Sequence, residues 1–164
     1  MRQVIKDRRL VADDWSYAGK DEAMGGKVAL PLAEYLAARA GASAGTATAV
    51  WLAPADDITP LLPHLGNLAL IAVEFTSSGE GRGYSQARLL RERHGYKGEL
   101  RAFGAVRVDQ IYFLARCGFD TFELAAGENV DLAIAQLHRF SVAYQDSTGG
   151  LVHPRRRDEA SSLQ

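Results

Sequence analysis

The pattern of apolar and polar positions along this chain changes character near residue 46. From there on, strand-length runs of apolar residues take turns with longer segments whose apolar positions recur at helical spacing. The run 68–75 (LALIAVEF) is apolar almost throughout, which is typical of a strand buried on both faces. Strands and helices that alternate in this way predict right-handed crossovers and a parallel sheet.

Residues 46–145 are predicted to hold four such strand–helix units. The strands are expected at 46–53, 68–75, 99–104 and 120–124, and the helices at 56–66, 84–94, 106–117 and 130–144. Asn129 can cap the last helix with its side chain. An α/β fold of four βα units fits either an open doubly wound parallel sheet or half of a (β/α)₈ barrel. Both architectures place the functional surface at the carboxyl ends of the strands.

The start of the chain has a different pattern. Val4–Ile5 and Leu10–Val11 are short apolar runs on either side of Asp7-Arg8, which predicts a small N-terminal β-hairpin. A helix is expected from Pro31 to Gly41, because proline suits the first position of a helix and glycine commonly follows the last one.

These elements predict a single α/β domain over residues 1–145. Its parts are the N-terminal hairpin and helix (1–45) and the βα repeats (46–145). Residues 146–164 are polar and end in HPRRRDEASSLQ, so we expect a disordered tail there.

The loop TSSGEGRGYS (76–85) joins the buried strand 68–75 to a predicted helix. Its glycines let a ligand approach the backbone, and arginine side chains suit the oxygens of a small anion. The predicted anion site consists of Gly81, Arg82, Gly83, Ser85, Arg88 and Arg101. The alternative is an ordinary strand–helix turn, because the loop matches neither the dinucleotide-binding nor the Walker motif.

Arg101 alternates with Leu100 and Ala102 on a strand that we expect to be mostly buried. A buried arginine needs a carboxylate or an anion as partner, and Glu74 and Asp109 are the candidate carboxylates. If the chain is an enzyme, Glu80 and Asp109 would supply its acid–base chemistry.

Charge is unevenly distributed along the chain. The whole chain has a net charge of −1, which gives no general electrostatic reason to bind nucleic acid or an acidic membrane. Residues 79–116, however, hold eight Lys/Arg and four Asp/Glu, and seven of those eight cations are arginine. This basic centre indicates an oxyanion or carboxylate partner, or else a set of solvated helix faces.

Cys117 is the one cysteine of the chain, so no intramolecular disulfide and no all-cysteine metal cluster can form. It ends a predicted helix, where the helix dipole raises the pKa of a thiol, and a structural thiol is therefore expected. The four histidines show no metal-ligand spacing, so no metal site is predicted. No flavin or nicotinamide motif appears either, and the cofactor stays unknown.

No apolar run has the length of a signal peptide core or of a membrane span, so we expect a cytoplasmic protein without a membrane partner.

The motifs GRGYS-ARLLRER, GELRA-G and DQ–F-ARCGFD-FEL closely resemble those of one bacterial family, the domain of unknown function 934, and the resemblance extends over about residues 1–145. Members of that family are typically encoded beside assimilatory sulfite or nitrite reductase and described as oxidoreductases or accessory proteins of sulfite reduction. The family usually has a Phe-Pro strand end followed by an aspartate before GRGYS. Here Glu80 takes the place of that acid.

The resemblance implies a role in sulfur assimilation and cysteine biosynthesis, with sulfite reductase as partner. Three hypotheses follow. The chain is an accessory protein or oxidoreductase of sulfite reduction that binds a small oxyanion, or a small βα enzyme for a phosphorylated or sulfonated metabolite. The third is a non-catalytic interaction module, and exposed sheet edges would then favour a homodimer. One cysteine cannot ligate an iron–sulfur cluster, so the chain is not itself the reductase.

Overall fold

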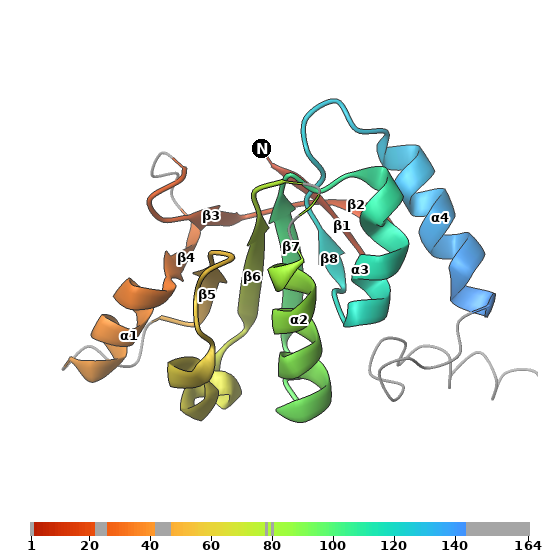
Figure 1. Ribbon diagram of the computed structural model, residues 1–164. Helices are drawn as coiled ribbons and strands as arrows, with labels where there is room; N and C mark the ends of the chain where they lie inside the picture. The colour runs from red at the N-terminus through yellow and green to blue at the C-terminus, as the bar shows by residue number, and fades with distance from the viewer. Residues whose placement is uncertain (1, 22–25, 42–46, 78, 80, 144–164) are drawn as a thin grey trace, which may run out of the picture.

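A single eight-stranded sheet organises the chain. The computed structural model describes residues 2–21, 26–41, 47–77, 79 and 81–143 (Figure 1). The strand order in the sheet is β2-β1-β8-β7-β6-β5-β4-β3. The strands are β1 (Gln3–Lys6), β2 (Arg9–Ala12), β3 (Trp15–Tyr17), β4 (Lys27–Pro31), β5 (Ala49–Leu52), β6 (Leu70–Phe75), β7 (Glu99–Gly104) and β8 (Thr121–Phe122).

The helical segments follow the strands of the parallel part of the sheet. They are α1 (Leu32–Ala40), η1 (Thr59–Asn67), α2 (Arg82–Arg88), η2 (Leu89–Arg93), η3 (Val108–Gln110), α3 (Ile111–Cys117) and α4 (Val130–Ala143). Asn129 caps α4 as predicted, because its Oδ1 accepts the Leu132 N–H at 3.0 Å. Within the described residues, no helix is long and apolar enough to cross a membrane.

The predicted N-terminal hairpin is confirmed. β1 and β2 pair antiparallel, with Lys6 opposite Arg9. Asp7 and Arg8 form the connecting turn, and both have positive φ angles, 52° and 60°. Two such angles are typical of the type I′ turn, whose twist matches that of the flanking strands.

The prediction of a purely parallel sheet is wrong. The predicted architecture of four βα units is not confirmed. β1 lies antiparallel to both β2 and β8, so the sheet is mixed. β3 pairs parallel to β4, and β4 pairs parallel to β5, so the four N-terminal strands belong to the same sheet as the strands after residue 46. The physical reason is that a sheet of β5, β6, β7 and β8 alone would leave unpaired backbone groups along its two outer strands. β1 pairs with the outer edge of β8, and β4 pairs with the outer edge of β5.

Helices cover one face of this sheet. Val50, Ile71, Val73 and Leu100 point to that face, where they form the main hydrophobic core together with buried residues of α1, α2, α3 and α4. A doubly wound sheet carries helices on both faces. The one-sided arrangement and the curl of the sheet therefore correspond to the half-barrel alternative of the prediction.

The opposite, concave face is crossed by the N-terminal segment. β2 ends at Ala12 and β3 begins at Trp15, although these two strands lie at opposite ends of the strand order. Three residue steps of extended chain span at most about 11 Å, so the two ends of the sheet approach each other there. Figure 1 shows β2 and β3 running in nearly one line across the sheet.

Gly104 at the end of β7 offers a test of this packing. Its φ is +94°, and a Cβ added there would lie 2.4 Å from the Phe75 carbonyl oxygen. Because strain and a backbone clash combine, Gly104→Ala should lower the free energy of unfolding by about 2 kcal/mol or more. Gly127→Ala is the matched control, since Gly127 has a φ of +86° but nothing within 4 Å of the added Cβ. Equal losses for the two variants in urea unfolding would contradict the clash.

Candidate functional site

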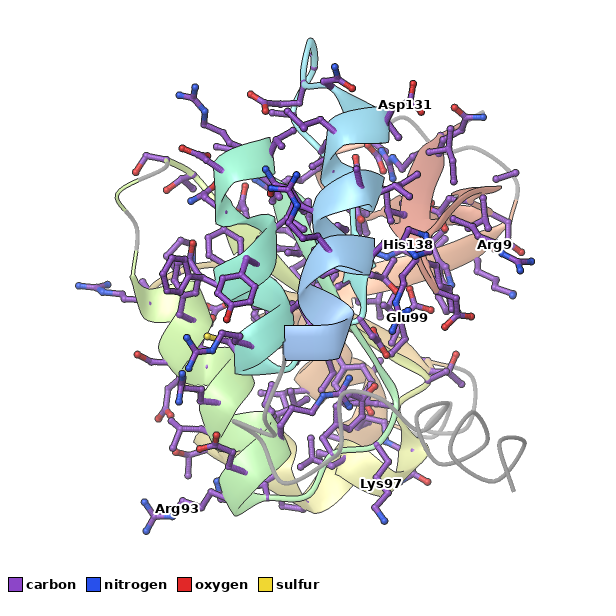
Figure 2. The ribbon with its side chains drawn as sticks, turned by 90° about the vertical axis from the view of Figure 1, so that its right-hand side faces the viewer. Arg9, Arg93, Lys97, Glu99, Asp131 and His138 are labelled. Carbon is purple, nitrogen blue, oxygen red and sulfur yellow. The ribbon has the colours of Figure 1, made fainter. Side chains whose placement is uncertain are left out.

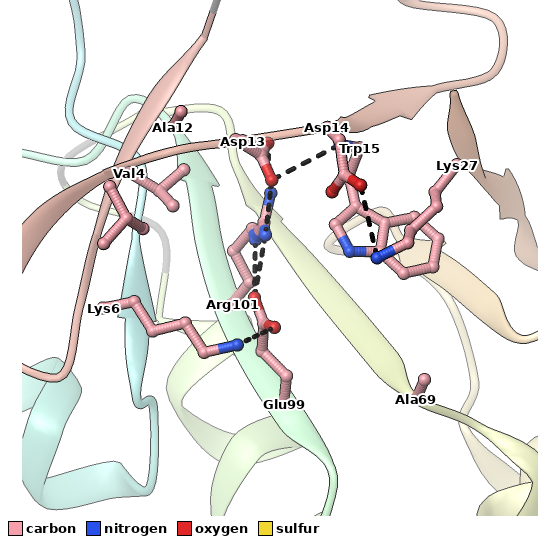
Figure 3. A pocket seen from close by; sticks show the side chains of 11 residues that line it. Val4, Lys6, Ala12, Asp13, Asp14, Trp15, Lys27, Ala69, Glu99 and Arg101 are labelled. Atoms are coloured by element: carbon pink, nitrogen blue, oxygen red, sulfur yellow. Dashed lines mark hydrogen bonds and ion pairs between the residues drawn. The ribbon is translucent and has the colours of Figure 1, made fainter. Parts of the chain in front are cut away.

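Arg101 is the largest side chain that is fully buried among the described residues, with 1% of its surface exposed. It leaves β7 on the concave face, where its Nη1 and Nη2 donate to the two carboxylate oxygens of Asp13 at 2.7 and 3.0 Å. Its Nε and Nη2 donate to Glu99 Oε1 at 3.1 and 2.8 Å, and Nη1 also donates to the Tyr17 hydroxyl at 3.4 Å. Figure 3 shows the guanidinium held between the two carboxylates.

This arrangement corrects the sequence-based expectation for Arg101. Glu74 and Asp109 were the candidate partners, but the structure pairs Arg101 with Asp13 and Glu99. Glu74 pairs instead with Lys20. Asp13 lies 88 residues before Arg101 in the chain and is brought to it by the crossing between β2 and β3.

The network continues from Arg101 toward the start of the chain. The Tyr17 hydroxyl donates to Glu123 Oε2 at 2.7 Å, and Glu123 Oε1 lies 3.1 Å from Arg2 Nε. Arg2 in turn pairs with Asp21 at 2.6 Å, and its guanidinium lies 4.7 Å from the centre of the Tyr17 ring. Three cations and four carboxylates, with Lys6 and Glu99 among them, thus meet on the concave face of the sheet.

Burial shapes the protonation of this network. Burial raises the pKa of the Tyr17 hydroxyl, and neighbouring Glu123 raises it further despite the opposing effect of Arg101, so the phenol keeps its proton. Burial also raises the pKa of Glu123. Burial alone would lower the pKa of Arg101, but its bonds to Asp13 and the charge of Glu99 raise it. The guanidinium is therefore permanently charged and its donors are occupied, which describes a structural element and not an open anion site.

A hollow of about 490 Å³ borders this network on the side of the Lys6–Glu99 pair. Its charged lining residues pair with one another, as Lys6 does with Glu99, at 2.8 Å, and Lys27 with Asp14, at 3.3 Å. It is lined by Val4, Lys6, Val11, Ala12, Asp13, Asp14, Trp15, Lys27, Ala69, Glu99 and Arg101 (Figure 3). Paired charges of both signs give no single ligand chemistry to this hollow.

The other residues of the predicted anion site lie on the helical side of the sheet. Gly81 precedes α2, Arg82 and Ser85 are exposed on it, and Arg88 is close to half exposed at its end. Gly83 is buried because α2 packs closely against β6 there: an added Cβ would lie 2.6 Å from the Phe75 ring. The sheet separates these residues from Arg101, so the structure groups five of the six predicted residues and leaves Arg101 out.

The two predicted acid–base residues have different outcomes. Glu80 lies outside the described residues. Asp109 is exposed in η3, on the same helical side as α2, and its charge acts on the Tyr84 hydroxyl of α2. It therefore lies close to α2 and apart from Arg101.

Arg91 is a buried arginine that the sequence reasoning missed. Its guanidinium donates to the backbone carbonyls of Gly118, Tyr96 and Gly98 at 2.8–2.9 Å and pairs with Asp120. The signal was present in the sequence: Arg91 follows the buried Leu90 and lies four residues after the buried Ala87, on the inward face of the helix.

The single thiol is buried, as predicted for a structural cysteine. Burial raises the pKa of Cys117, although the nearby Arg88 and Arg116 oppose this shift. A buried thiol that keeps its proton is a poor nucleophile. Among the residues that the structure describes, no group of His, Cys, Asp and Glu could hold a metal ion.

Glu99 makes the network sensitive to acid. Burial alone would raise its pKa, but Arg101 and Lys6 together lower it below the ordinary value of 4.5. A carboxylate with a lowered folded-state pKa stabilises the fold above its unfolded-state pKa, and this stability is lost as the pH falls through the folded-state pKa. The wild type should therefore be more stable than Glu99→Gln at pH 7, and the difference should shrink as the pH falls from about 5 toward 3.

Urea unfolding of both proteins at several pH values measures this difference. Glu92→Gln, which removes a half-exposed carboxylate of the surface pair with Arg88, is the control and should change stability little at any pH. A difference between wild type and Glu99→Gln that stays constant down to pH 3 would rule out the proposed role of Glu99.

The sequence model of one family matches residues 49–152, which is more than half of the chain. Neither the curated proteins nor the solved structures gave a match. The matched region begins at β5 and includes every strand and helix after it in the described chain, with Arg91 and Arg101 among its residues. The chain belongs to the family described as bacterial protein of unknown function (DUF934).

Proposed function

We propose that this chain is an accessory protein of assimilatory sulfite reduction that acts by binding and not by redox chemistry of its own residues. The observation that carries the proposal is the division of its arginines. Arg91 and Arg101 are buried and saturated by carbonyl and carboxylate groups. Arg82, Arg88, Arg93 and Arg107 are exposed on or beside the helices that cover the sheet.

Support for the sulfur context comes from the family. The motifs that resemble its members extend from Gly81 to Leu124 and fall entirely within the matched region. The resemblance relates these motifs to sulfite reductase. An accessory role needs no reactive thiol, because the partner enzyme would carry out the electron transfer. It is therefore compatible with a chain whose one cysteine is buried.

The exposed side of α2 gives this proposal its ligand chemistry. Arg82, Ser85 and Arg88 are spaced by three residues each, so they form one stripe along the helix surface. Guanidinium and hydroxyl groups suit the oxygens of sulfite or of a carboxylate. We propose this stripe, with Gly81 at its start, as the anion-binding element; Arg101 is not part of it.

A growth experiment tests the proposed function. Deletion of the gene should abolish growth on sulfate as sole sulfur source, and sulfide or cysteine should restore it. Wild type and Cys117→Ala should complement the deletion, because the buried thiol has no part in the proposed role. Arg82→Glu combined with Arg88→Glu should not complement, because the stripe then repels anions.

The matched control is Arg9→Glu, which reverses an exposed charge on β2 and should complement fully. A deletion strain that grows normally on sulfate would refute the proposed function.

A further inference from the structure

We draw no further inference here: the strongest candidate, the surface of α2 and α3 around the exposed Phe113 (Figure 2), presents arginine and carboxylate side chains together, as in the pair of Arg88 with Glu92, and nothing in the described part of the chain shows what covers it.

Discussion

The ion pair between Arg101 and Asp13 is the constraint on which the rest of this structure depends. A guanidinium in the middle of a sheet is tolerated only when its donors are satisfied, and here five hydrogen bonds to Asp13, Glu99 and Tyr17 satisfy them. Asp13 stands in the two-residue link between β2 and β3, so the pair fastens this link to the central strand β7. Through this pair, the segment that crosses the concave face is attached to the middle of the sheet.

The two faces of the sheet therefore have different tasks. On the concave face, Tyr17 stacks on Phe103 with ring centres 4.1 Å apart, and the charged groups around Arg101 are paired. This face holds the N-terminal segment in place. On the helical side, Arg82 and Arg88 of α2 and Phe113 of α3 reach the surface. An α/β protein usually binds at the carboxyl ends of its strands; we propose that this chain binds through its helices.

The sequence predicted the elements well and their long-range partners poorly. β7 spans residues 99–104 as predicted, and the predicted hairpin turns at Asp7-Arg8. Both features depend on residues that are neighbours in the sequence, so a local pattern is enough to predict them. β3 was not foreseen as a strand, since three residues show no periodicity. Its place beside β4 depends on the crossing that Arg101 and Asp13 fix.

The candidate site shows the same limit. An alternating pattern on β7 was enough to infer that Arg101 is buried and needs a carboxylate. No local pattern points to Asp13, which is 88 residues away, and the order of the strands favours Glu74 and Asp109 instead. Exposed residues such as Phe113 carry no signal in the sequence either, because helical spacing alone does not tell which side chains the neighbouring helix leaves uncovered.

A double-mutant cycle on Asp13 and Arg101 tests most directly whether their pair holds the fold together. Asp13→Asn, Arg101→Met and the double variant would be compared with the wild type by urea unfolding at pH 7. Asp13→Asn leaves the buried Arg101 with Glu99 as its remaining carboxylate, and Arg101→Met removes the cation that pairs with Asp13. Each single variant should therefore cost about 3–5 kcal/mol, while the double variant should cost less than their sum by about 2–3 kcal/mol. Additive losses, with a coupling energy near zero, would contradict the account.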